Sequence, residues 1–324
     1  MLSARNKENG KMKTPICDLL GIQYPIIQGG MAWISDAHLA AAVSNAGGLG
    51  VIAAGNASGE AVREEIRKAK ELTKNPFGVN IMLVSPHADE VARIVGEESV
   101  PVVTTGAGNP AKYMAAWKGA GIKVIPVVAS TGLAKLLQRT GVSAVIAEGT
   151  EAGGHIGETG TMALIPQVCD AVDLPVIAAG GIGDGRGIAA ALMLGAQGVQ
   201  MGTRFLLARE CNIHPNYKDR IIAAKDITTM ATGRRLGHPV RSLKTAFSRE
   251  FLAKEYDSSI SHQEQEALGA GAFQLAVKEG DLKRGCFMAG QIAGLLQREQ
   301  SAEEIIEELV AETVATLKEA EKLL

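Results

Sequence analysis

The most constraining feature of this sequence is a regular alternation of short apolar runs with longer amphipathic stretches between Thr14 and Thr203. Short unbroken apolar runs are typical of strands buried on both faces of a parallel sheet. Eight runs fit this description, at residues 25–30, 48–53, 77–83, 100–106, 124–128, 144–148, 175–181 and 198–203. This pattern predicts an α/β fold of the (β/α)8 TIM-barrel type, because the alternative, a doubly wound sheet, usually carries only about five to six strands.

The stretches between these runs predict the helices that connect one parallel strand to the next. They cover residues 36–46, 60–72, 88–95, 110–120, 132–139, 163–171 and 187–194. Serine is a preferred helix N-cap, because its side-chain oxygen accepts a hydrogen bond from a free backbone N–H. Ser35 and Ser58 are therefore expected to cap the first two of these helices.

The alternation stops after Phe205, which predicts a second structural unit. Residues 209–254 hold ten Lys/Arg against four Asp/Glu, and residues 263–278 predict one further helix. We expect the barrel to cover 14–208 and 288–324, with a C-terminal helix capped by Ser301 and Glu304. Residues 209–287 would form a smaller, mostly helical domain on the substrate side. Its basic stretch is either a solvated surface or a landing site for an anionic partner such as a dinucleotide or an acidic carrier.

Composition and charge exclude several classes of protein. Residues 1–13 are polar and lysine-rich, which predicts a disordered leader and not a signal peptide. The net charge of −2 gives no nucleic-acid-binding bias, and no apolar run reaches the length of a membrane span. The four cysteines lie far apart in the sequence, which favours reduced thiols in a cytoplasmic protein.

One segment combines glycines with titratable side chains directly after a predicted strand. It runs from Ala147 to Gly157 and contains Glu148, Glu151 and His155. Parallel α/β proteins carry their chemistry at the carboxyl ends of their strands. A histidine there, with an ordinary pKa near 6.5, can exchange a proton near neutral pH. A lone histidine is usually structural, so the residue by itself leaves both roles open for His155.

Two glycine clusters follow the seventh and eighth predicted strands, at 180–183 and 201–204. In barrels the loops after these two strands frequently bind a phosphate through backbone N–H groups, and glycine permits the close approach. Tight turns are the alternative explanation for either cluster alone. The stretch 181–186 lacks the third glycine of a dinucleotide fingerprint and follows the seventh strand, so a Rossmann site is excluded.

Further polar residues and glycines are expected on the same rim. Residues 28–31, Gln-Gly-Gly-Met, end the first strand, and Asn80 lies within the third. A buried amide needs hydrogen-bond partners, which the edge of a flat heteroaromatic ring or the neighbouring backbone could supply. Residues 104–108, which include Thr104 and Thr105, follow the fourth strand, and Lys123 precedes the fifth; both are expected to extend this rim.

Together these motifs resemble the nitronate monooxygenase and enoyl-acyl-carrier-protein reductase II family, which consists of FMN-dependent (β/α)8 barrels. The resemblance covers nearly the whole chain after Thr14 and is carried by residues 28–31, 78–80, 148–157 with Thr161, 178–182 and 201–204. The glycine–histidine motif around His155 is shared by both branches of the family. Residues 214–217 and 288–294 look like the reductase branch.

The resemblance implies a role for individual residues. His155 would be the catalytic residue, in contact with the substrate above the flavin. The FMN-binding residues would be Gly29, Gly30, Met31, Asn80, Thr105, Lys123, Glu148, Gly153, Ala179, Gly180, Gly181, Met201, Gly202 and Thr203. Such reductases also form homodimers and respond to monovalent cations, although no motif in this sequence locates a metal site.

The implied activity is the reduction of a trans-2-enoyl thioester on acyl carrier protein, with NADH or NADPH as co-substrate, in fatty-acid elongation. The alternative within the family is a nitronate monooxygenase, which oxidises nitroalkanes with O2. Two other classes stay open from the residues alone: a flavin-free barrel that isomerises a phosphorylated metabolite, and a binding barrel without turnover. The preferred nicotinamide and the acyl chain length are not indicated by any residue.

Overall fold

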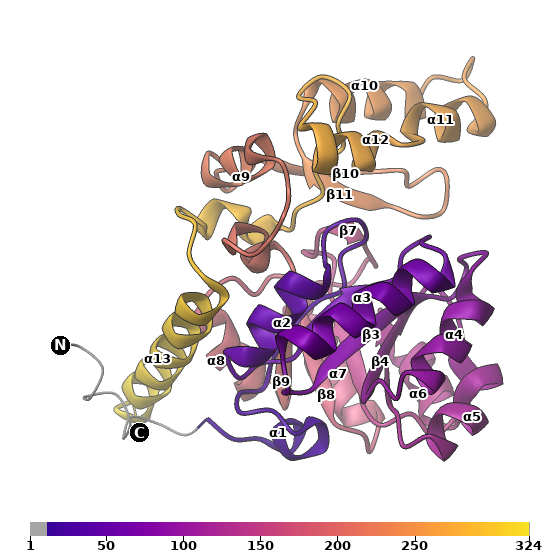
Figure 1. Ribbon diagram of the computed structural model, residues 1–324. Helices are drawn as coiled ribbons and strands as arrows, with labels where there is room; N and C mark the ends of the chain where they lie inside the picture. Colours follow the sequence, from indigo (N-terminus) through magenta and orange to yellow (C-terminus); the bar gives the residue numbers. More distant parts are fainter. Residues whose placement is uncertain (1–11, 324) are drawn as a thin grey trace.

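The computed structural model describes residues 12–323, so the expected leader lies almost entirely outside the described residues. Eight parallel strands form one sheet that closes into a barrel (Figure 1). They are β1 (Ile26–Gln28), β2 (Gly50–Ala53), β3 (Phe77–Met82), β4 (Val102–Gly106), β5 (Lys123–Val128), β6 (Val145–Glu148), β8 (Val176–Ala179) and β9 (Gly198–Met201). A parallel bridge between Ile27 and Leu49 joins the first strand to the second and completes the closure. The predicted (β/α)8 barrel is confirmed.

Helices surround the barrel and cover the outward-facing side chains of its strands (Figure 1). They are α2 (Ala37–Asn45), α3 (Gly59–Leu72), α4 (Ala88–Glu97), η1 (Pro110–Tyr113), α5 (Met114–Gly119), α6 (Thr131–Gln138), α7 (Thr161–Ala171), α8 (Gly185–Met193), η2 (Thr203–Leu207) and α13 (Ala302–Glu321). The first helix, α1 (Pro15–Leu20), instead packs against the side chains inside the barrel. None of the helices in the described part of the chain has the length and apolarity that a membrane crossing requires.

The side chains inside the barrel form a separate apolar cluster, which fixes the facing of every strand. Ile27, Val51, Val102, Ile125 and Ile177 belong to this inner cluster, together with residues of α1. Because side chains alternate between the two faces of a strand, each inner residue fixes the facing of the residues two positions along. This alternation decides which side chains reach the mouth at the carboxyl ends.

The helix caps confirm two predictions and correct a third. Ser58 caps α3, and Ser301 forms a capping box with Glu304 at the start of α13. The prediction for Ser35 is wrong, because Asp36 caps α2 by accepting the N–H of Leu39. The Ser35 hydroxyl accepts the N–H of Met31 over 2.9 Å, and so shapes the loop after β1.

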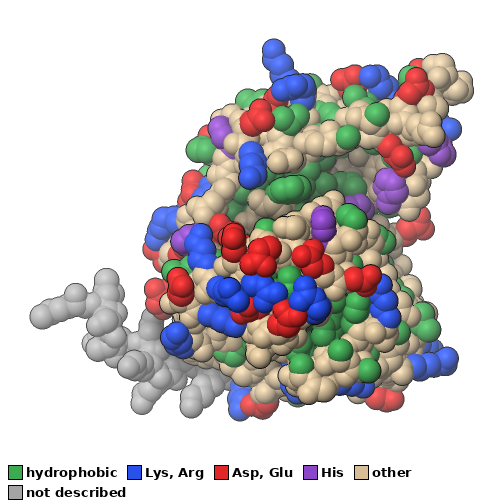
Figure 2. All heavy atoms as spheres, turned by 45° about the vertical axis from the view of Figure 1, so that its right-hand side comes forward, with side chains coloured by type: hydrophobic (Ala, Val, Ile, Leu, Met, Phe, Trp, Pro, Cys, Tyr) green, Lys and Arg blue, Asp and Glu red, His purple; other side chains and the backbone are tan. Residues whose placement is uncertain are grey.

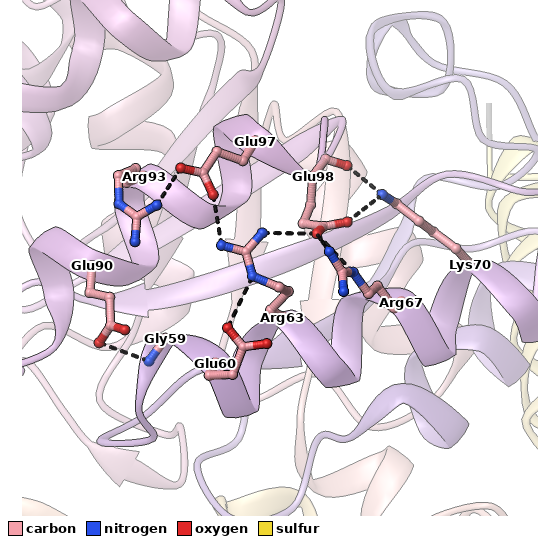
Figure 3. Close-up of polar contacts among 9 residues, drawn as sticks. All are labelled: Gly59, Glu60, Arg63, Arg67, Lys70, Glu90, Arg93, Glu97 and Glu98. Atoms are coloured by element: carbon pink, nitrogen blue, oxygen red, sulfur yellow. Dashed lines mark hydrogen bonds and ion pairs between the residues drawn. The ribbon is translucent and has the colours of Figure 1, made fainter.

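An ion network joins α3 to the end of α4 on the outer surface (Figure 3). The Glu98 carboxylate, whose side chain is only 10% exposed, lies within 3.0 Å of Arg63, Arg67 and Lys70. Burial acts to raise the pKa of Glu98, but the three cations outweigh it and lower the pKa to about 2. The network therefore holds two neighbouring helices of the barrel together.

The second unit lies over the carboxyl-end mouth of the barrel (Figure 1). It contains α9 (Pro215–Ile222), β10 (Thr229–Thr232), β11 (Val240–Leu243), α10 (Ala246–Glu255), α11 (His262–Gly269), α12 (Ala272–Gln274) and a π-helical turn, η3 (Leu275–Glu279); the turn η4 (Gln291–Leu295) follows it. The single helix predicted over 263–278 is wrong. Gly271 adopts a left-handed φ of +74°, which interrupts it.

A three-stranded antiparallel sheet connects this unit to the barrel. Its order is β10–β11–β7, and β7 (Gly154–His155) belongs to the loop that follows β6. The sequence pattern predicts a mostly helical second unit and no strands in it. The short strand β7 has no apolar pattern of its own and exists because β11 supplies its hydrogen-bond partners.

Candidate functional site

His155 lies on β7, between the barrel mouth and the second unit. It is the register partner of Val240 on β11, and the next backbone N–H, of Ile156, donates to the Pro239 carbonyl over 3.0 Å. Figure 2 shows a hollow between the barrel and the second unit, with hydrophobic side chains on its walls and histidine side chains at its border. The strand pairing therefore fixes an imidazole at the junction of the two units.

A second imidazole faces His155 across this junction. The ring centroids of His155 and His238 are 6.3 Å apart, in an edge-on arrangement with an interplanar angle of 62°. Burial, and to a lesser degree the charge of His238, lower the pKa of His155 below its ordinary value. A lower pKa makes the protonated ring a stronger acid, but it also leaves a smaller share of the ring protonated near neutral pH.

Glu148 ends β6 on the inner face of the barrel, two residues after the inner-cluster residue Ile146. The Glu148 side chain is half-buried. Its carboxylate makes no hydrogen bond within residues 12–323. This desolvation raises the pKa of Glu148 to about 7. A carboxyl group at the barrel mouth that makes no hydrogen bond within the protein can accept hydrogen bonds from hydroxyl or N–H groups of a bound ligand.

The loop after β1 packs against β3 and β9 so closely that it requires glycine. A Cβ on Gly30 would lie 2.4 Å from the Asn80 Cβ, and a Cβ on Gly29 would lie 3.2 Å from the Gln200 side chain. Asn80 donates from Nδ2 to the Thr104 hydroxyl over 2.9 Å, and no donor within residues 12–323 reaches its Oδ1. This rim therefore offers a floor without side chains at Gly29 and Gly30, beside an amide oxygen that no described donor reaches.

The glycine clusters after β8 and β9 meet two other loops. Gly180 and Gly181 adopt left-handed φ values of +84° and +70°. A Cβ on Gly180 would lie 2.8 Å from the Gly149 carbonyl oxygen, and one on Gly153 would lie 2.7 Å from the Ala289 carbonyl carbon. The loops at 149–153, 180–181 and 289–290 are thus packed backbone against backbone at one corner of the mouth.

This corner also has free hydrogen-bond donors. Within residues 12–323, the backbone N–H groups of Gly181 and Ile182 find no acceptor. Thr203, at the next loop, accepts the N–H of Gly290 at its hydroxyl oxygen over 2.9 Å. Unpaired N–H groups beside glycines form the kind of concave surface that binds phosphate oxygens.

Two predicted site residues do not join the others. Lys123 begins β5 at its amino end, opposite the mouth, because its N–H donates to the Pro101 carbonyl before β4 begins. Thr105 points outward from β4, since Val102 and hence Thr104 face the interior. The Thr105 hydroxyl is buried and has no hydrogen-bond partner among the described residues.

The remaining predicted residues are brought to the mouth by the four loops and strand ends described above: Gly29, Gly30, Met31, Asn80, Glu148, Gly153, Ala179, Gly180, Gly181, Met201, Gly202 and Thr203. Ala179 and Met201 contribute through their backbone, since their carbonyl groups accept from Gly149 and Gly29. Thr104, which the sequence places on this rim next to Thr105, reaches Asn80. Gln200 and Gly290 are not among the site residues that the sequence predicts. The alternation of side chains along β9 could have identified Gln200, but only the tertiary fold brings Gly290 here.

The described part of the chain, residues 12–323, contains no group of three or more His, Cys, Asp or Glu side chains arranged to hold a metal ion. The groups gathered at the site include two imidazoles, one carboxyl group of raised pKa and a set of backbone amides. This inventory fits a site that orients a bound organic cofactor and transfers protons.

Comparison with known proteins agrees with this picture. A family model described as nitronate monooxygenase matches residues 13–98 and 85–312. The FabK structure from Thermotoga maritima is 49% identical, with a TM-score of 0.94, and the match covers 96% of this chain and 99% of that one. A nitroalkane oxidase structure from Streptomyces ansochromogenes is 30% identical, with a TM-score of 0.85, over 94% of this chain and 99% of that one.

A third similar protein is named for a different reaction. It is the (3aS,4S,5R,7aS)-5-hydroxy-7a-methyl-1-oxo-octahydro-1H-indene-4-carboxyl-CoA dehydrogenase of Mycobacterium tuberculosis, 33% identical over 97% of this chain and 99% of the relative. Each of these three matches covers at least 94% of this chain, and the chain is an enzyme, a flavin-dependent oxidoreductase. On the family-model match and on its identity with these relatives, the chain belongs to the nitronate monooxygenase family.

Proposed function

We propose that this enzyme reduces trans-2-enoyl thioesters carried by acyl carrier protein to the saturated acyl thioesters, using FMN and NAD(P)H. The observation that carries the proposal is the 49% identity to FabK over 96% of the chain, compared with 30% to the nitroalkane oxidase. The thioester in the name of the Mycobacterium tuberculosis relative supports an acyl thioester as the substrate class.

The residues at the mouth fit an FMN molecule. The free N–H groups of Gly181 and Ile182, with Gly202 and Thr203, would hold the phosphate. Glu148 and Gly153 would lie along the ribityl chain, and the floor made by residues 29–31 with Asn80 and Gln200 would support the ring. When bound, FMN supplies the transfer of hydride from NAD(P)H to the β-carbon of the enoyl thioester.

The chain's own residues bind, orient and supply the proton. His155, fixed by the pairing of β7 with β11, donates a proton to the α-carbon of the substrate. The second unit lies over the mouth and limits the access of water to the reacting atoms (Figure 1). The hollow between the two units is lined with hydrophobic side chains, which suits an acyl chain (Figure 2).

The proposal also includes a protein partner, a cellular compartment and a number of subunits. The partner would be acyl carrier protein in fatty-acid elongation, and the enzyme would act in the cytoplasm as a homodimer. The basic stretch of the second unit supports an acidic partner. Arg234 is exposed, and its guanidinium lies 4.0 Å from the carboxylate of Glu158, which is 88% exposed. This ion pair is weak, so the guanidinium is available to a partner. Arg235, in contrast, donates from Nη1 to the Glu255 carbonyl and is part of the loop's structure.

An anaerobic stopped-flow experiment on the flavin-loaded protein tests the proposal. NADH or NADPH should bleach the flavin absorbance, and crotonyl thioester should restore it. The His155→Ala variant should be reduced at the wild-type rate but reoxidised by the thioester on the order of 10²-fold more slowly. A flavin that the thioester does not reoxidise would overturn the proposal.

Nitronate monooxygenase is the second candidate, and the family model and the Streptomyces ansochromogenes structure favour it. In that reaction His155 would take an α-proton from the nitroalkane, and O2 would be the oxidant. The same apparatus separates the two activities. A monooxygenase would be reduced anaerobically by a nitronate and not by either nicotinamide, whereas the proposed reductase would show the reverse pattern.

A further inference from the structure

The inference concerns Arg241, a buried charged side chain that the proposed reaction does not use. Arg241 lies on β11, where it is the register partner of Gly154 on β7, and it is only 7% exposed. Charged side chains are almost never this deeply buried unless an opposite charge pairs with them. The contacts of this guanidinium therefore decide whether its charge is satisfied within the chain.

Within residues 12–323 the guanidinium of Arg241 contacts only neutral acceptors. Its Nε donates to the Thr150 carbonyl over 3.1 Å, and its Nη1 donates to the Thr229 hydroxyl over 3.3 Å. A guanidinium carries five N–H groups, so these two bonds leave three without an acceptor in the described part of the chain. The Nη2 atom is not one of the fully enclosed polar atoms that lack a partner among these residues, so it reaches solvent.

The carboxylates near Arg241 are committed to other groups. Glu151 accepts the N–H of Thr161 over 2.9 Å and its hydroxyl over 2.8 Å. Glu158 lies 4.0 Å from the exposed Arg234. Burial is the main effect on the pKa of Arg241 and lowers it; the charge of Glu151 opposes this effect, and the like charge of Arg234 adds to it. The guanidinium is thus a buried cation that forms no ion pair with any carboxylate of residues 12–323.

The two acceptors fix where this guanidinium lies. Thr150 belongs to the loop after β6, at the carboxyl-end mouth of the barrel, and Thr229 begins β10 of the second unit. Arg241 therefore lies at the junction of the two units. Because side chains alternate along a strand, it points to the opposite face of the sheet from His155, whose register partner is Val240. A ligand group that pairs with Arg241 must therefore be remote from the atoms that react beside His155.

We propose that Arg241 binds a phosphate group of a reactant, and the identity of the reactants rests on the proposed function. A guanidinium with free N–H groups on Nη1 and Nη2 can make two parallel hydrogen bonds to a phosphate. Both reactants of the reductase carry phosphate far from the reacting carbon atoms. These are the diphosphate of NAD(P)H and the phosphate that joins the pantetheine arm to the carrier protein, and the same contact serves either one.

Equilibrium binding to the oxidised, flavin-loaded protein tests this contact without turnover. Calorimetry compares crotonyl phosphopantetheine with crotonyl pantetheine, which lacks the phosphate, and NAD+ with nicotinamide riboside, which lacks the diphosphate. In Arg241→Gln the dissociation constant of at least one phosphate-bearing ligand should rise about tenfold or more, while that of its phosphate-free counterpart stays unchanged. The pair of ligands that responds identifies the source of the phosphate.

Two further variants separate phosphate binding from a structural role. Arg241→Lys keeps the charge but loses the paired N–H groups, so it should lose part of the affinity for the same ligand. Arg249→Gln, at an exposed position of α10 in the same unit, is the control and should change none of the dissociation constants.

A merely structural role, through the contact with Thr150, would weaken the binding of both members of a pair equally. Equal losses for both members, or no loss in either pair, would overturn the proposal. Failure of the proposed function is distinct, because it would appear in the wild-type protein, whose reduced flavin crotonyl thioester would then not reoxidise.

Discussion

The backbone N–H of Gly290 donates to the hydroxyl oxygen of Thr203 over 2.9 Å, in the interior of the protein. Thr203 begins the turn after β9, the last strand of the barrel, and Gly290 follows the second unit. This bond therefore joins the predicted phosphate corner to the point at which the chain returns from the second unit. It makes the geometry of the cofactor site dependent on the docking of that unit.

Replacing Thr203 by valine should weaken FMN binding. The valine side chain cannot accept the Gly290 N–H, and a buried donor without a partner costs about 1–3 kcal/mol. We expect the dissociation constant for FMN, measured by flavin fluorescence quenching, to rise about tenfold. Thr203→Ser keeps the hydroxyl and is the matched control. Equal affinities in the two variants would contradict a role for this hydrogen bond.

Replacing Gly180 by alanine should destabilise the protein and empty the flavin site. Gly180 has a φ of +84°, and its new Cβ would lie 2.8 Å from the Gly149 carbonyl oxygen. The left-handed conformation alone costs an alanine about 1–2 kcal/mol. Urea unfolding and flavin content report the effect. Gly119→Ala, in α5, is the control, because no heavy atom lies within 4 Å of a Cβ there; it should leave the flavin content unchanged and should not lower the free energy of unfolding.

Glu148 should make the stability of the flavin-free protein fall as the pH rises. Desolvation raises its pKa from 4.5 to about 7 in the folded state, so folding favours the protonated form. Its stabilising contribution is complete below pH 4.5 and is lost as the pH rises to about 7. The change amounts to at most about 3 kcal/mol. Urea unfolding at pH 5 and 8 should show this slope in the wild type and a weaker one in Glu148→Gln.

Glu98 should have the opposite effect on the pH dependence of stability: its contribution should fall as the pH falls. Its lowered pKa of about 2 means that its contribution is present above the ordinary value of 4.5 and is lost as the pH falls toward 2. Glu98→Gln should reduce the free energy of unfolding at pH 7 by about 1–2 kcal/mol, because solvent screens part of each ion pair. Glu97→Gln, at an exposed position of the same network (Figure 3), should have a smaller effect, measured by urea unfolding.

Reversing the charge of Arg234 should weaken the interaction with a carrier-bound substrate. The exposed guanidinium adds to the positive field near the junction, and such steering is screened by salt. Arg234→Glu should raise KM for enoyl-acyl carrier protein more at low than at high ionic strength, while kcat changes little. Lys278→Glu is the control, on another exposed base of the same unit. Arg235 is unsuitable, because its substitution would disturb the Glu255 contacts.

The sequence determined the barrel and the corner that binds the phosphate in our proposal. Strand count, helix order and the caps at Ser58 and Ser301 follow from local periodicity and hydrogen-bonding chemistry, which act over a few residues. The glycines at 180 and 181 were visible as well, because a turn that needs a left-handed φ leaves few other choices of residue.

Tertiary structure decided the facing of side chains and the pairs between distant segments. Thr104 and not Thr105 reaches Asn80, since a shift of one residue along a strand moves a side chain to the other face. Lys123 lies at the amino end of β5, opposite the mouth, as its position before the fifth predicted strand already indicates. His155 meets His238 only because β7 pairs with β11, a contact between distant segments that depends on the path of the whole chain.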